Sequence, residues 1–191
     1  AREIRSSSLS MALEQLNGDN LLEYILLASK DKLPSLSKKA LYVLIEKFPA
    51  QSVDTLQRCL TSENYGLRDT AIFYLSRHHS IDIADIYREK LTSAKDNELY
   101  SIIMGLAESG VETDWALVST YEDSHRPKVK AAVIRASERL SQPSTKWLLG
   151  KIDHGCPAEV AAARAVILST DNYRLEEVEQ AHLNANSEIS S

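Results

Sequence analysis

The chain has 191 residues, of which 43% are hydrophobic and 26% are charged, and its formal net charge at pH 7 is −5. This composition is typical of an ordinary globular protein, and the acidic balance argues against a general nucleic-acid binder, which usually carries a strong basic excess. Long disordered tracts are not expected, because Gly and Pro are few, and no apolar run approaches the ~20 residues that span a bilayer.

Helical segments follow one another along the chain, because apolar residues recur at spacings of four, five and eight rather than alternating as in strands. The stretch around Leu9–Leu16 fits the second helix of a partial unit over about residues 5–18. First helices are then predicted near residues 20–30, 51–61, 81–92, 113–122 and 143–152. Second helices alternate with them near residues 36–48, 66–78, 97–109, 127–140 and 157–169. A more polar helix over residues 172–184 is expected to cap the C-terminal end, and residues 185–191 are expected to form a disordered tail.

A step of 31 residues relates these segments to one another. In the second helices it connects two apolar columns, Leu41, Ile72, Ile103, Ile134 and Ala165, and Leu44, Leu75, Leu106, Ser137 and Leu168. In the first helices it connects Ile25, Leu56, Tyr87, Val118 and Leu149. Pro34 and Pro127 lie three periods apart, each just before a second helix. Proline is well tolerated there, because a backbone N–H in the first helical turn has no acceptor within the helix. The apolar columns of the first helices and those of the second helices thus share one period. This predicts an all-α solenoid of about five two-helix repeats, with partial repeats at both ends, in a single domain over residues 1–191.

The helix predicted near residues 66–78 contains the pattern Leu67-Arg68-x-x-Ala71-x-x-x-Leu75, which resembles the bacterial HEAT-like repeat in its short version, named after phycobilisome lyases. The resemblance covers nearly the whole chain and fades toward the C-terminus, where Leu75 corresponds to Ser137. It implies a non-catalytic scaffold that binds a protein or peptide partner in a concave groove lined by the second helices. It also leaves two alternatives: a bilin lyase or lyase subunit, or a module that grips a nucleic-acid backbone.

The groove would be lined by two columns that point away from the core columns of Leu36, Ala40 and Leu44 on a helical wheel. These columns contain Lys38, Asp69, Tyr100, Ala131 and Ala162, and Tyr42, Phe73, Met104, Arg135 and Val166. We predict that partner binding involves Tyr42, Phe73, Tyr100, Met104 and Arg135, because Tyr and Arg are favoured interface anchors and Met adapts to varied partners. The alternative is that these side chains pack sideways against the next repeat.

A second patch of basic residues lies in and before the fourth second helix, with Arg126, Lys128 and Lys130 at its centre and His125, Arg135 and Arg139 nearby. Such a cluster is suited to an acidic partner or a phosphate backbone. The alternative is a solvated helix face that Glu138 and nearby acidic residues neutralise.

The sequence contains no Gly-rich phosphate loop, no paired Cys-x-x-Cys and no His-Glu-x-x-His motif. His154 and Cys156 fall short of the four ligands of a structural zinc site, and Cys59, in an apolar helix, is expected to be buried and inert. We therefore expect no catalytic residues, no metal and no cofactor. Two cysteines are too few for a disulfide framework, which favours a cytoplasmic location.

Overall fold

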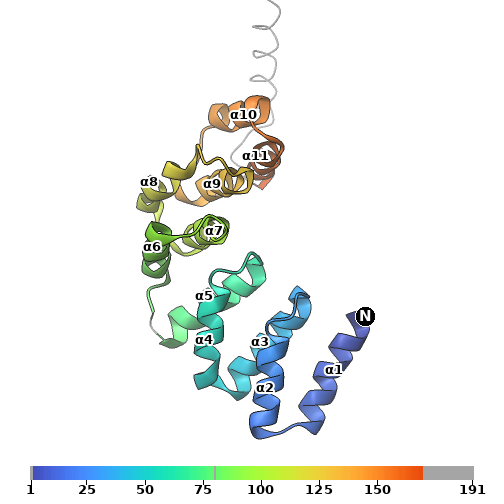
Figure 1. Cartoon of the computed structure of the whole chain (residues 1–191). Coiled ribbons are helices and arrows are strands. Elements are labelled where there is room, and N and C mark those ends of the chain that lie inside the picture. The colour runs from blue at the N-terminus through green and yellow to red at the C-terminus, as the bar shows by residue number, and fades with distance from the viewer. Residues whose placement is uncertain (1, 80, 170–191) are drawn as a thin grey trace, which may run out of the picture. The chain divides into compact units, whose positions relative to one another are not determined.

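The computed structural model describes residues 2–79 and 81–169, and within these ranges the chain forms eleven α-helices and two short 3-10 helices joined by turns (Figure 1). The chain divides into two compact units, Ala1–Ile83 and Ala84–Ser191, each of which is described by itself. The predicted capping helix over residues 172–184 and the tail over 185–191 lie outside the described residues. None of the helices in the described ranges is both long enough and apolar enough to cross a membrane.

Unit 1 contains five helices: α1 (Arg2–Gln15), α2 (Gly18–Ala28), α3 (Pro34–Lys47), α4 (Pro49–Cys59) and α5 (Tyr65–His79). Each helix packs against the next one in the chain, and α3 also contacts α1 and α5. Pro34 and Pro49 are the first residues of α3 and α4, where proline's fixed backbone suits the first helical turn. The sequence-based ranges for α2 to α5 are confirmed to within two residues, whereas α1 begins and ends three residues before the predicted range of 5–18.

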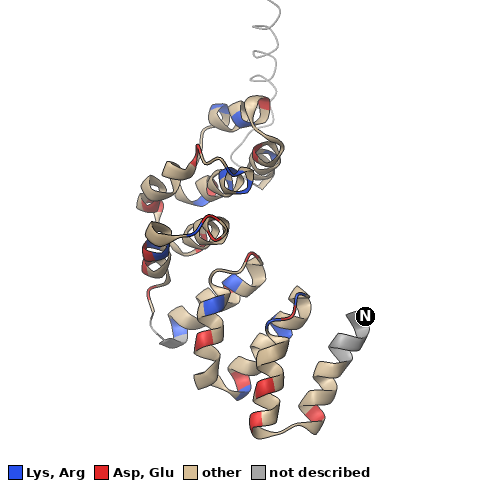
Figure 2. Cartoon of the chain, in the orientation of Figure 1, with Lys and Arg blue, Asp and Glu red and all other residues tan. Residues whose placement is uncertain are grey.

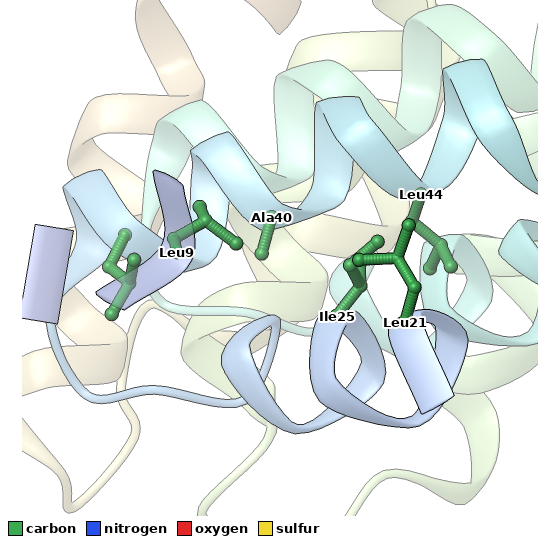
Figure 3. Close-up of a cluster of buried hydrophobic side chains, with 6 residues drawn as sticks. Leu9, Leu21, Ile25, Ala40 and Leu44 are labelled. Atoms are coloured by element: carbon green, nitrogen blue, oxygen red, sulfur yellow. The ribbon is translucent and has the colours of Figure 1, made fainter. Parts of the chain in front are cut away.

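The core of unit 1 forms where α1, α2 and α3 meet (Figure 3). Leu9 from α1, Leu21 and Ile25 from α2, and Ala40 and Leu44 from α3 point toward one another and are buried. Fully burying a leucine or isoleucine side chain contributes about 1.5–3 kcal/mol, so this cluster is a main source of stability in the unit.

Unit 2 contains α6 (Ile83–Ser93), α7 (Leu99–Ser109), α8 (Trp115–Val118), α9 (Pro127–Leu140), α10 (Thr145–His154) and α11 (Pro157–Ser169). Two 3-10 helices, η1 (Glu112–Asp114) and η2 (Ser119–Tyr121), flank α8. Helix α9 is central, because it packs against α7, α8 and α11.

The helix predicted over residues 113–122 is therefore wrong in detail, since the structure divides this stretch into η1, α8 and η2. The hydroxyls of Ser119 and Thr120 explain part of the difference. They donate hydrogen bonds to the carbonyls of Ala116 (3.4 Å) and Leu117 (2.7 Å), three residues earlier. Such local bonds compete with the regular i to i−4 ladder and favour a tighter turn.

The apolar columns hold for most of the chain and fail in the last helix. Leu44, Leu75 and Leu106 are fully buried, as predicted, but Leu168 of α11 is 86% exposed. Val166 is buried instead, although its column was predicted to point away from the core. The reason is that α11 turns a different stripe inward, made of Ala162, Ala163 and Val166. This stripe packs against Ala131 and Ile134 of α9 and Leu148 of α10.

Candidate interaction surface

In unit 1, the side of α3 and α5 that faces away from the core carries two exposed aromatic rings. Tyr42 of α3 is 43% exposed and Phe73 of α5 is 45% exposed. The Tyr42 hydroxyl lies 3.5 Å from Thr70 Oγ1 of α5, so the Tyr42 ring reaches across to α5. Within the unit, two of the five residues predicted for the groove thus lie on adjoining helices and are open to solvent.

Basic side chains lie over both of these rings. Lys38 Nζ is 5.7 Å from the centroid of the Tyr42 ring, one helical turn away on α3. Arg77 Cζ is 4.9 Å from the centroid of the Phe73 ring, one turn away on α5. A cation over an aromatic face is attracted by the ring quadrupole, and the pair presents both positive charge and flat apolar surface. We name the surface of Lys38, Tyr42, Phe73 and Arg77 the aromatic face.

In unit 2, the structure brings together three of the predicted residues from α7 and α9. Arg135 Nη1 donates a hydrogen bond to the Tyr100 hydroxyl (3.3 Å), and Lys128 Nζ lies 4.8 Å from the centroid of the Tyr100 ring. Tyr100 and Met104 are half-buried, whereas Lys128 and Arg135 are exposed. The Tyr100 ring is thus less exposed than the rings of Tyr42 and Phe73, and side chains of α9 contact it.

The predicted basic patch is divided among different neighbours. Arg126 Nη2 lies 3.1 Å from Asp96 Oδ2, while Lys130 Nζ lies 3.8 Å from Glu159 Oε2. Lys128 belongs with Tyr100 instead. Lys and Arg are interspersed with Asp and Glu on the helices of both units, which fits a solvated, largely neutralised surface (Figure 2).

A cleft of about 590 Å³ lies beside α10 in unit 2, and the sequence analysis did not find it. The loops that precede and follow α10, one face of α10 itself, and the starts of α9 and α11 contribute its walls. Its lining residues are Glu122, Lys130, Ser144, Lys146, Trp147, Gly150, Lys151, His154, Gly155 and Glu159. We name it the α10 cleft.

A charged network forms the floor of the α10 cleft. Lys151 Nζ lies 2.7 Å from Glu122 Oε1 and 4.0 Å from Glu159 Oε1. Trp147 Nε1 donates a hydrogen bond to the same Glu122 oxygen (3.1 Å), and Lys151 Nζ lies 5.2 Å from the Trp147 ring centroid. These contacts fix the orientations of Trp147 and Lys151 on α10.

Glu159 is the most buried charge of this network, with 6% of its side chain exposed. It accepts a hydrogen bond from the backbone N–H of Cys156 (2.9 Å), which is the reciprocal bond of a helix N-terminal cap. Burial acts to raise the pKa of Glu159, but the hydrogen bonds from Cys156 and the charges of Lys130 and Lys151 outweigh it, so the pKa is lowered. The side chain therefore remains a carboxylate and holds the start of α11 against the cleft.

A second buried ion pair, which no sequence pattern signals, stabilises the stretch around α8. Arg88 of α6 donates hydrogen bonds to both carboxylate oxygens of Asp114, at 2.7 and 2.9 Å. These bonds lower the pKa of Asp114 despite burial, with help from the backbone N–H of Val111 (2.9 Å). The bidentate geometry fixes α6 to the loop after α7 and gives the pair a structural role.

Unit 1 also contains a smaller polar cleft, of about 300 Å³, between the ends of α2 and α4 and the start of α5. Cys59 lies at its edge and is buried, as predicted. Burial raises the pKa of this thiol, although the nearby Arg58 acts in the opposite direction. A thiol in this state is a poor nucleophile at neutral pH.

Within residues 2–79 and 81–169, no group of three or more His, Cys, Asp and Glu side chains is placed to hold a metal ion. A scan against models of known protein families, a search of curated proteins and a search of solved structures each found no match to this chain.

Proposed function

We propose that the protein is a non-catalytic scaffold, a solenoid of HEAT-like repeats that binds a protein or peptide partner on the exposed side of its second helices. The 31-residue period of buried leucines and the packing of each helix on its neighbours within each unit support the repeat architecture.

The observation that carries the binding proposal is the exposure of Tyr42 and Phe73 on the aromatic face. Large aromatic side chains are costly to leave in water and are common anchors at interfaces. Two such rings at equivalent positions of successive repeats form the kind of spaced array that an extended or helical segment can contact at two points. The Lys and Arg side chains over the rings add attraction for a partner with acidic residues.

The test uses the aromatic face and a matched control elsewhere on unit 1. A partner is captured on the 191-residue chain and identified, and its affinity is measured for Tyr42→Ala, Phe73→Ala and Leu27→Ala. Leu27 on α2 is also exposed, at 70%, but does not lie on the aromatic face. We expect each aromatic substitution to weaken binding by about 2 kcal/mol while changing the melting temperature little, and Leu27→Ala to leave affinity unchanged.

Three results would contradict the proposal. Unfolding of Tyr42→Ala and Phe73→Ala would show that the rings are packing elements. Affinity for duplex DNA or RNA that falls steeply with salt would favour the nucleic-acid alternative. A shift in visible absorption on mixing the protein with a bilin would favour the lyase alternative.

A further inference from the structure

One face of α10 borders the α10 cleft and has an unusual composition. Lys146, Gly150 and His154 follow one another at four-residue spacing, so they lie in a row along the helix. All three line the cleft, with Trp147 and Lys151 in the adjacent row. The row therefore has a lysine near one end, a histidine at the other end and no side chain in its middle.

The glycine in this row is not explained by packing inside the protein. A methyl group built on Gly150 would meet no atom within 4 Å, whereas one on Gly105 would lie 2.1 Å from the Tyr87 ring. Glycine in a helix interior is unfavourable relative to alanine, because it loses more backbone freedom on folding. An unfavourable residue with open space above it, in the wall of a cleft, suits the close approach of a second backbone.

The polar side chains of the cleft fall into two groups, those that form ion pairs and those that form none. Lys130 and Lys151 are held by Glu159 and Glu122. In the part of the chain that the structure describes, Lys146 and His154 form no ion pair and are exposed. The two carboxylates of this network are thus occupied, and the Lys146 ammonium and the His154 ring N–H at the ends of the row are available to carboxylate acceptors.

The separation of Lys146 and His154 limits what can meet both. Eight residues of helix correspond to about 12 Å at a rise of ~1.5 Å per residue. A single phosphate or carboxylate cannot span that distance. An extended peptide rises ~3.3 Å per residue, so side chains four residues apart are ~13 Å apart and project to the same side.

We propose that this row on α10 binds an extended peptide segment of a partner protein that carries two carboxylates four residues apart. One carboxylate pairs with Lys146 and the other accepts a hydrogen bond from the His154 ring N–H, while the peptide backbone runs along the row and passes over Gly150. The site is separate from the aromatic face, so it stands whether or not that face binds a partner.

The test uses Trp147 as the reporter. The chain has two tryptophans, so the Trp115→Phe variant of the full chain leaves Trp147 as the sole tryptophan probe. It is titrated at low ionic strength and pH 7 with the peptide acetyl-Glu-Ser-Gly-Ser-Glu-amide. A second titration uses the same residues with adjacent acids, acetyl-Glu-Glu-Ser-Gly-Ser-amide. We expect a saturable fluorescence change for the first peptide and an affinity about fivefold lower for the second, since one surface ion pair contributes up to a factor of about five.

Substitutions then locate the site. Lys146→Ala should weaken binding about fivefold, and Gly150→Leu should abolish it while leaving the circular-dichroism spectrum unchanged. Gly150→Ala adds only a methyl group, a smaller change than leucine. It should weaken binding while raising the melting temperature by ~2 °C. Lys90→Ala, at an exposed lysine of α6 outside the cleft, is the matched control and should bind as the parent does.

Several outcomes overturn the proposal. They are no saturable change with the first peptide, equal affinity for the two peptides, or equal binding by Lys146→Ala and the parent. Inorganic phosphate that competes as strongly as the peptide would show a small-anion site instead.

Discussion

The contact between Gly105 and Tyr87 offers the sharpest test of the packing in unit 2. Tyr87 of α6 is fully buried, and its ring lies directly over Gly105 in the middle of α7. A methyl group at Gly105 would lie 2.1 Å from Tyr87 Cζ and 2.5 Å from its hydroxyl oxygen. Both separations are far below van der Waals contact, so Gly105→Ala forces the ring or α7 to move.

The expected size of the effect follows from two opposing contributions. Overpacking a buried site costs about 1–3 kcal/mol, and the depth of this overlap places it at the upper end. Alanine gains about 1 kcal/mol over glycine in a helix interior. We therefore expect Gly105→Ala to lower the free energy of unfolding by about 2 kcal/mol. Gly150→Ala, where the same methyl meets nothing, should raise it by about 0.5–1 kcal/mol.

The assay is urea unfolding followed by tryptophan fluorescence, which reports on unit 2 because Trp115 and Trp147 are the two tryptophans of the chain. Tyr87→Leu removes the ring and should cancel the penalty of Gly105→Ala in a double-mutant cycle. A Gly105→Ala protein as stable as the parent would refute the close packing of α6 on α7. Equal effects of alanine at Gly105 and Gly150 would refute the distinction between the two glycines.

Three further predictions concern the core, pH and metals. Leu75→Ala in unit 1 and Leu106→Ala in unit 2 should each cost about 2–5 kcal/mol in chemical denaturation, because both side chains are fully buried, and costs below ~1 kcal/mol would show that the wheel assignment is wrong. Hydrogen bonding lowers the pKa of Asp114 in the folded state, so the contribution of this carboxylate to folding stability is complete above about pH 4 and is lost as pH falls through the folded-state pKa. Asp114→Asn should therefore lower the free energy of unfolding at pH 7 and make its decrease below pH 4 less steep. An unchanged dependence of stability on pH would contradict this role. EDTA should leave the melting temperature unchanged, and a large fall would indicate a metal at the loop of His154 and Cys156.

Much of the fold follows from local information in the sequence. Helix positions were predicted to within two residues for most elements, because amphipathic spacing and proline at the first turn act within one segment. The exception is the stretch around α8, where hydroxyl bonds to nearby carbonyls and the distant pairing of Arg88 with Asp114 decide the geometry. The prediction of one continuous domain stays a prediction, and the chain divides into two compact units.

The candidate sites depended more strongly on tertiary structure. Residues of one sequence column have different surroundings, since Tyr42 and Phe73 are exposed while Val166 is buried. A helical wheel gives the direction of a side chain on its own helix, but exposure depends on which neighbouring helix lies over it. Small residues let α11 approach α9 closely and turn a different stripe inward.

In the α10 cleft, too, the sequence gives the positions of side chains on the helix and the tertiary structure gives their surroundings. The spacing of Lys146, Gly150 and His154 can be read from the sequence, and it places them on one side of a helix. That this side borders a cleft, that Gly150 has open space above it, and that Lys151 is held by Glu122 and Glu159 depend on segments far apart in the chain. Periodicity by itself determined the helices and their apolar stripes, because those are properties of short segments. Only the tertiary structure decided which polar side chains pair and which stay open, because charges and backbones from separate helices meet only after packing.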